Sequence, residues 1–126
     1  MSLSNRLTKG ALGHILEGKQ IQEPIFQMLA YKNMPTDNNK RYRLSLNDGA
    51  YIYQCCIIVG DLAEKIETQE YDRYCLLKVK RYMLNEIQNK QVIVLADIQL
   101  LAKGSEVGER LGEPYTYGSP EAPPLR

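Results

Sequence analysis

The chain has 126 residues, a hydrophobic content of 44% and a formal net charge of +1, which allows one packed domain and little more. No apolar run approaches the ~20 residues that a membrane helix needs, and the N-terminus lacks the apolar segment of a signal peptide. Three cysteines, one histidine and no Cys-x-x-Cys pair argue against a disulfide framework and a structural zinc site. We therefore expect a soluble, intracellular domain without a cofactor and without membrane contacts.

Hydrophobic periodicity predicts a helix over residues 7–17, with Thr8 as its N-cap and Gly18 as its stop signal. Pro24 introduces an extended apolar run over residues 25–34, which is typical of a strand. A polar loop over residues 35–39 follows.

Residues 40–47 then alternate basic or polar side chains with apolar side chains, and Asp48-Gly49 follows them. This alternation predicts a strand with one buried face, and the Asp-Gly pair predicts a hairpin turn. Arg41 and Arg43 share one face of that strand, where two guanidinium groups on a rigid backbone form an anion-binding fork. The alternative is an ordinary solvated strand face.

The remaining periodicity predicts a third strand over residues 50–57 and a short amphipathic helix over 60–66. A fourth strand over 74–84, a polar turn over 85–90 and an apolar closing strand over 91–101 follow. Five strands with a helix after the third indicate an all-β, five-stranded OB-fold, a Greek-key barrel, here preceded by an N-terminal helix. SH3-like barrels also have five short strands, but the position of the second helix favours the OB-fold. We expect a disordered N-terminus over residues 1–6, the domain over 7–112 and a Pro/Gly-rich linker over 113–126.

The net charge of the chain is close to zero, but the charged residues are unevenly distributed along the sequence. Five acidic residues lie between positions 61 and 72, opposed only by Lys65, and look like a solvated helix and loop. Basic residues lie instead on the predicted strands or at their ends: Lys32, Lys40, Arg41, Arg43, Lys78, Lys80, Arg81 and Lys90. This pattern predicts a positive groove with an acidic back.

Six short motifs occur in an order and spacing that resemble the N-terminal domain of the large subunit of replication protein A. They are LTKGA at 7–11, PIFQ at 24–27, RYRL at 41–44 with DG at 48–49, KRYMLN at 80–85, VIVL at 92–95 and VGERLG at 107–112. The resemblance covers roughly residues 7–117 and implies an OB-fold that recruits proteins rather than an enzyme. It implies a basic groove for acidic amphipathic helices of replication, repair and checkpoint proteins, weak binding of single-stranded DNA, and a nuclear location. It also implies contacts with other replication protein A subunits through regions outside this chain.

The resemblance also implies the residues of the groove. Arg41, Arg43 and Lys32 would pair with carboxylates or phosphates, and Asn85 would donate or accept hydrogen bonds. The turn after Asn85 is one residue shorter than in the family and keeps Lys90 as its only base, which weakens the positive charge there. The expected groove residues are Lys32, Arg41, Tyr42, Arg43, Tyr53, Cys55, Ile57, Asn85, Lys90 and Val92.

Two further expectations depend on strand parity. If the third strand has no bulge, Tyr51 and Tyr53 face the groove together with Cys55 and Ile57 and give it an aromatic floor. Likewise, Lys78 and Lys80 share one face of the fourth strand, and Arg81 joins them only if that strand has a bulge.

Two other functions stay open. The main ligand could be single-stranded DNA, with the third-strand tyrosines stacking on its bases, or the domain could be structural within a larger assembly. The chain lacks a Gly-rich phosphate loop, G-x-S-x-G, H-E-x-x-H and an Asp-x-Asp cluster, so we expect no catalytic activity.

Overall fold

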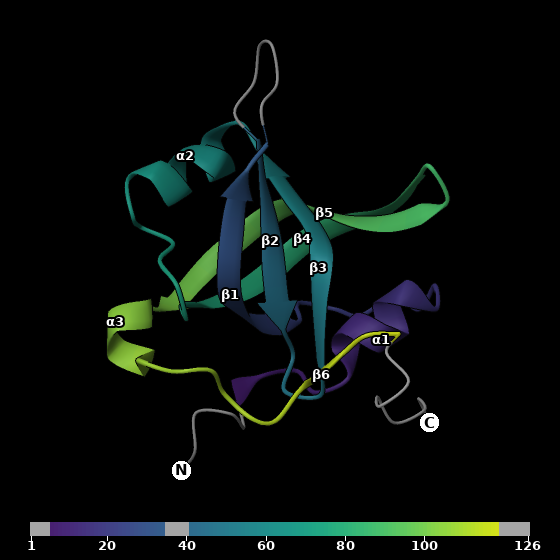
Figure 1. Cartoon of the computed structure of the whole chain (residues 1–126), viewed down its shortest axis with the longest axis horizontal. Helices are drawn as coiled ribbons and strands as arrows, with labels where there is room; N and C mark the ends of the chain where they lie inside the picture. Colours follow the sequence, from purple (N-terminus) through teal and green to yellow (C-terminus); the bar gives the residue numbers. More distant parts are fainter. Residues whose placement is uncertain (1–5, 35–40, 119–126) are drawn as a thin grey trace.

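The computed structural model describes residues 6–34 and 41–118. The predicted loop at 35–39, Lys40, nearly all of the predicted N-terminal tail and residues 119–126 of the predicted linker lie outside these residues. Five strands close into a mixed β-barrel with short helices around it (Figure 1), so the predicted OB-fold is confirmed. The barrel strands are β1 (Ile25–Asn33), β2 (Arg41–Asn47), β3 (Tyr51–Val59), β4 (Leu76–Ile87) and β5 (Lys90–Ala102).

The remaining elements are α1 (Ala11–Leu16), α2 (Asp61–Glu67), α3 (Gly104–Val107) and the two-residue strand β6 (Tyr115–Thr116). Neighbouring barrel strands follow the order β2-β1-β4-β5-β3, and a β2–β3 pairing closes the barrel. All barrel pairings are antiparallel except β3 with β5, where Ile57 lies opposite Val94. No described helix is long and apolar enough to cross a membrane.

The core lies inside the barrel and under α1. Alternate residues of β2 point inward, so Leu44 and Leu46 are fully buried between Arg43, Ser45 and their neighbours. Leu12 and Ile15 of α1 are buried at helical spacing against the same core. Burying such side chains stabilises the fold by about 1.5–3 kcal/mol each.

One carboxylate ties α1 to the β2–β3 turn. Asp48 is fully buried; its Oδ1 accepts hydrogen bonds from Ala50 N and Tyr51 N at 2.7 Å each, and its Oδ2 accepts one from Leu12 N at 2.8 Å. Burial raises the pKa of Asp48, and the backbone donors oppose that shift. Asp48 therefore joins α1 to the β2–β3 turn in addition to stabilising the turn itself.

The predicted N-cap of the first helix is wrong. Gly10 occupies the N-cap position of α1 with a φ of 83°, a left-handed conformation that glycine adopts at little cost. The Thr8 hydroxyl instead accepts a hydrogen bond from Ile25 N at 2.8 Å, which fixes the start of β1.

Irregular pairings bend the strands at two places that matter for the surface. On β3, Cys56 lies opposite Leu44 but Tyr53 lies opposite Leu46, so β3 carries one extra residue between these pairs. On β4, the register with β5 shifts between Val79 and Arg81 and again between Arg81 and Tyr82. Each bulge changes which side chains share a face.

The C-terminal segment packs against the barrel through buried amides. Leu111 N donates to Gln27 Oε1 at 2.8 Å, and Asn47 Nδ2 donates to Gln27 Oε1 at 3.0 Å and to Leu111 O at 2.8 Å. Beyond this point β6 pairs with the start of β3, and the Tyr117 ring packs against the rings of Tyr51 and Tyr53. Residues 115–117, which the sequence placed in the linker, thus lie on the barrel.

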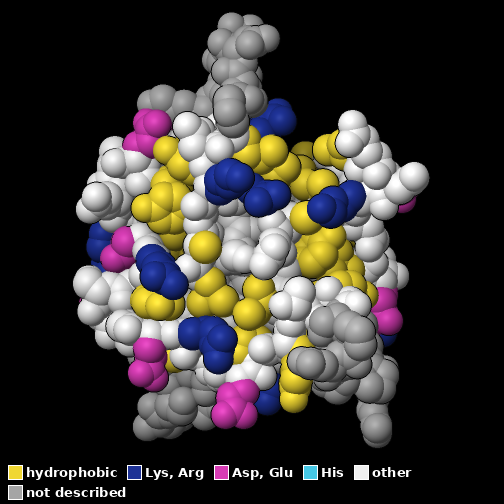
Figure 2. All heavy atoms as spheres, in the orientation of Figure 1, with side chains coloured by type: hydrophobic (Ala, Val, Ile, Leu, Met, Phe, Trp, Pro, Cys, Tyr) yellow, Lys and Arg dark blue, Asp and Glu magenta, His cyan; other side chains and the backbone are white. Residues whose placement is uncertain are grey.

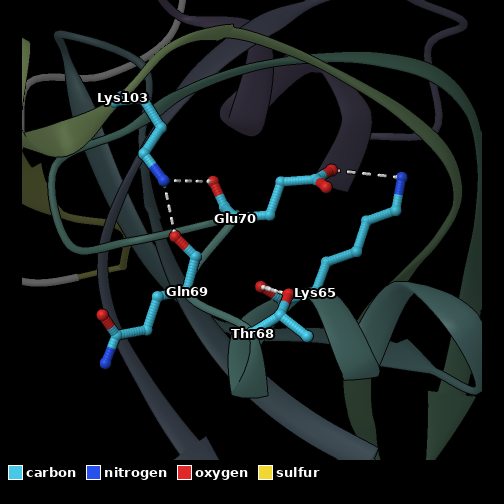
Figure 3. A network of polar contacts seen from close by, with 5 residues as sticks. All are labelled: Lys65, Thr68, Gln69, Glu70 and Lys103. Atoms are coloured by element: carbon cyan, nitrogen blue, oxygen red, sulfur yellow. Dashed lines mark hydrogen bonds and ion pairs between the residues drawn. The ribbon is translucent and has the colours of Figure 1, made fainter.

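The connection from α2 to β4 is held by lysines (Figure 3). Lys103 Nζ donates to the carbonyl of Gln69 at 2.6 Å and to that of Glu70 at 3.5 Å, and Lys65 Nζ lies 3.3 Å from the Glu70 carboxylate. Most of the predicted acidic run is exposed here, but Asp72 accepts hydrogen bonds from Gly104 N and Ser105 N. Asp72 therefore holds the start of α3.

Candidate functional site

A row of five cross-strand neighbours runs over the outside of the barrel. Lys32 lies opposite Arg43, Arg43 opposite Ile57, Ile57 opposite Val94, and Val94 opposite Met83. Directly opposed residues present their side chains on the same face of a sheet. The adjacent residues Leu44, Cys56 and Ile93 are fully buried, so the row itself faces outward. Its β1–β2 end is basic and the remainder is apolar.

A second set of residues extends this row along the strands. Cys55 and Val92 each precede a member of the row by two positions, and Asn85 lies opposite Val92. Arg41 lies opposite Val59, and Ile87 lies opposite Lys90 near the tip of the β4–β5 hairpin. We call the two sets together the outer face: Lys32, Arg41, Arg43, Cys55, Ile57, Val59, Met83, Asn85, Ile87, Lys90, Val92 and Val94.

The basic end of the outer face is hollowed. An open depression of about 230 Å³ is lined by residues of β1, β2 and β3: Ala30, Tyr31, Lys32, Arg43, Leu44, Ser45 and Gln54. Figure 2 shows Lys and Arg side chains around hydrophobic and uncharged ones over these strands, with acidic side chains at the margins of the view. The arrangement suits a ligand that carries both negative charge and an apolar surface.

Arg41 is partly buried at the same end of β2. Its Nε is buried and has no hydrogen-bond partner among the described residues. An unsatisfied donor of this kind lowers stability, and an acceptor that reached it would recover that energy.

The predicted aromatic floor is wrong. The bulge in β3 reverses the parity between Cys56 and Tyr53, so Tyr53 stands opposite the buried Leu46 and packs against the core. Its hydroxyl donates to the carbonyl of Gln91, and burial raises the pKa of Tyr53 to about 12. Tyr51 is buried with 4% of its surface exposed.

Tyr42 also lies off the outer face. It is opposite the buried Ile58, packs against the core, and meets the Tyr31 ring edge to face with centroids 6.0 Å apart. The register therefore places eight of the ten predicted residues on the outer side of the barrel, where Val92 is buried with 6% of its surface exposed. Tyr42 and Tyr53 are partly buried and pack against the core.

Four apolar members of the outer face were not predicted. They are partly or strongly exposed; Met83, for example, keeps 54% of its surface accessible. Two of them could have been predicted from the sequence, because Met83 and Ile87 are two positions before and after Asn85 and so share its face of the strand. The four are Val59, Met83, Ile87 and Val94.

The closed barrel and the placement of its helices define the protein as an OB-fold domain. The chain belongs to the family described as Replication factor-A protein 1, N-terminal domain, whose model matches residues 7–103.

Several similar proteins are 70 kDa DNA-binding subunits of replication protein A. The Gallus gallus subunit is 26% identical over 117 residues, and the Drosophila melanogaster subunit is 24% identical over 116 residues. These alignments cover 91% and 88% of this chain and 19% of each subunit. The Xenopus tropicalis subunit is 25% identical over 120 residues, covering 94% of this chain and 20% of that subunit. The chain thus spans about a fifth of the length of these relatives.

Proposed function

We propose that this domain recruits proteins to single-stranded DNA by binding acidic amphipathic helices on the outer face. The observation that carries the proposal is the cross-strand row, in which Lys32 and Arg43 adjoin Ile57, Val94 and Met83. A helix with carboxylates on one side and apolar anchors on the other matches both halves of that row. The predicted site residues on the outer face, including Cys55, Asn85, Lys90 and Val92, surround the same contact.

The two halves of the row have different roles in this proposal. Carboxylates of the partner pair with Arg43, Lys32 and the partly buried Arg41, whose Nε has no hydrogen-bond partner in the described part of the chain. Apolar side chains of the partner pack on Ile57 and Val94. Ordering a disordered segment costs several kcal/mol, so we expect affinities of about micromolar order.

Single-stranded DNA is the second candidate ligand. Lys32 and Arg43 line the hollow and offer two cations to phosphates. Tyr31 also lines it, but Tyr31 lies opposite the buried Leu44 and its ring meets that of Tyr42, off the outer face. The inward positions of Tyr51 and Tyr53 remove the larger stacking surface that this ligand would use. We therefore propose weak DNA binding at the basic end as a secondary activity.

The family supplies the wider context of the proposal. The relatives are DNA-binding subunits, and this chain corresponds to about a fifth of their length. We propose that it acts in the nucleus within a replication protein A complex, joined to the other subunits through regions outside this chain. Its partners would be replication, repair and checkpoint proteins, and no catalytic role is proposed.

A two-ligand titration tests the function. Fluorescence anisotropy would compare a labelled acidic amphipathic peptide with a labelled oligo-dT, using the unmodified domain and Arg43→Glu. We expect tighter binding of the peptide and its loss on charge reversal. Glu109→Lys, exposed in the segment after α3, is a matched charge-reversal control and should leave peptide affinity unchanged. Tighter oligo-dT binding would instead make DNA the main ligand, and binding of neither would refute both proposals.

A further inference from the structure

A second surface lies along the unpaired edge of β4, beside the outer face, with which it shares Met83, Asn85 and Ile87. β1 pairs with β4 only over Leu76 to Lys78, and Val79 N then donates to Pro24 O at 2.8 Å. From Lys80 to Ile87, β4 pairs with β5 on one side, and no strand of the described chain pairs with the other side. This edge is about 25 Å long and presents backbone donors and acceptors at alternate residues.

Two hollows lie along this edge. The connection from α1 to β1 and the residues of β4 from Lys80 to Tyr82 enclose one of about 300 Å³. The end of α1 and residues 82–85 enclose another of about 380 Å³. Gln20 and Tyr82 line both, so the hollows are neighbours. The Tyr82 hydroxyl accepts a hydrogen bond from Ile21 N at 3.0 Å, which fixes the wall between them.

A bulge brings two bases together at one end of this edge, whereas Glu86 lies toward its other end. In a regular strand Lys80 and Arg81 would point to opposite faces, but the register shifts around Arg81, and both residues line the first hollow. Lys19 lines the second, but its Nζ lies 3.8 Å from the carboxylate of Glu17, and Glu23 is the one acidic residue lining either. Asp97, opposite Arg81 on β5, offsets part of this charge. The second hollow also has apolar walls formed by Ile15, Leu84 and Met83.

We propose that the β4 edge binds an extended acidic segment of a partner protein by strand addition. The backbone of the segment pairs with β4 from Arg81 toward Ile87, an apolar side chain enters the second hollow, and acidic side chains lie near Lys80, Arg81 and Lys19. Strand addition obtains affinity from main-chain hydrogen bonds and specificity from pockets for alternate side chains, and the edge offers both.

The test uses a short alternating peptide, acetyl-Glu-Val-Asp-Leu-Glu-Val-Asp-amide, and the ¹⁵N-labelled domain. Titrations are made in the Arg43→Glu background, so that binding to the outer face does not contribute. We expect the amide signals of Arg81, Met83 and Asn85 to shift and their hydrogen exchange to slow. Reversing Lys80 and Arg81 to Glu should weaken binding by up to about fivefold for each charge.

A peptide with the same side chains but N-methylated along its backbone is the matched control. The methylated peptide keeps its charges but loses its backbone N–H donors. If the peptide binds by strand addition, the methylated form should not bind. Equal binding of the methylated peptide, shifts confined to β2 and β3, or no binding at millimolar peptide would overturn the proposal. Analytical ultracentrifugation tests whether a second copy of the chain occupies the edge instead. A dimer that the peptide dissociates would assign the edge to that second copy and would also overturn the proposal.

Discussion

Arg43 on β2 lies directly opposite Ile57 on β3, so a guanidinium and an apolar side chain stand side by side on one outer surface. The two strands belong to a closed barrel, which keeps this neighbourhood rigid. Charge and apolar contact are thus adjacent but reside on different residues. Substitutions can therefore remove the charge and the apolar contact separately.

Ile57→Ser and Arg43→Gln should weaken binding of the acidic peptide in different ways. Loss of the Ile57 contact should lower the affinity about tenfold at both low and high salt, because burial of apolar surface is not screened. Loss of the Arg43 charge should matter at low salt and much less at high salt. Anisotropy titrations at two salt concentrations distinguish these responses, and identical salt dependence of the two variants would contradict the proposed division of roles.

The free thiol of Cys55 gives a second measure of occupancy. Cys55 is partly exposed on the outer face, whereas Cys56 and Cys75 are fully buried. We expect one thiol of the native domain to react quickly with DTNB, and three after denaturation. Bound peptide should slow the fast reaction and Cys55→Ser should abolish it. Fast reaction that saturating peptide does not slow would separate Cys55 from the binding surface.

Alternation predicted β2 well and β3 poorly, for a physical reason. In β2 basic or polar side chains alternate with apolar ones, so the apolar residues mark the buried face. Arg41 and Arg43 must then lie on the opposite, outward face. From Tyr51 to Val59 both parities carry apolar residues, and the extra residue leaves no mark in such a pattern. Only the pairing with Leu44 and Leu46 reveals the bulge.

Polar composition likewise hid the length of the β4–β5 hairpin. Residues 85–90 were predicted to be a turn, but the turn is Gln88-Asn89, with φ values of 52° and 63°, and both strands continue to it. Backbone pairing does not require apolar side chains, so polarity alone misplaced the strand ends. The C-terminal segment was missed because its anchors, Gln27 and Asn47, are far away in the sequence.

Alkaline pH should destabilise the domain through its two buried thiols, of which Cys75 is the easier to test. Burial raises the pKa of Cys75 from 9.0 to about 12. The unfolded chain therefore releases this proton first, so the contribution is complete below pH 9 and is lost as the pH rises toward 12. The urea midpoint should fall over that range, and Cys75→Ala should start lower at pH 7 but fall less steeply. Parallel pH profiles for the two proteins would contradict this assignment.

Gly104 permits a close backbone approach at the start of α3. A Cβ at this position would lie 1.7 Å from the carbonyl oxygen of Arg73, and Gly104 N donates to Asp72 at 2.6 Å. Gly104→Ala must therefore displace the α2–β4 connection, and we expect a loss of about 3 kcal/mol in the free energy of unfolding. Ser105→Ala, exposed at the next position, should change it by less than about 0.5 kcal/mol. Equal urea midpoints for the two variants would show that the connection moves freely.

Gln27 should decide whether the C-terminal segment stays on the barrel. Its side chain is fully buried, accepts from Leu111 N and Asn47 Nδ2, and donates to Glu109 O at 2.7 Å. Gln27→Leu leaves these groups buried without partners, each at a cost of about 1–3 kcal/mol, unless the segment detaches into water. Detachment is the cheaper outcome, because β6 adds only two pairs to β3.

Hydrogen exchange measures this detachment directly. In Gln27→Leu the amides of Tyr115 and Tyr117, which donate to Ala50 O and Ile52 O, should exchange faster, while the amide of Ile93 in the core keeps its protection. Gln99→Leu, the same change at an exposed position of β5, is the matched control and should leave both regions unaltered. Uniformly faster exchange would mean that Gln27 supports the whole barrel rather than the segment. Unchanged exchange would mean that the contacts of β6 and Tyr117 hold the segment without it.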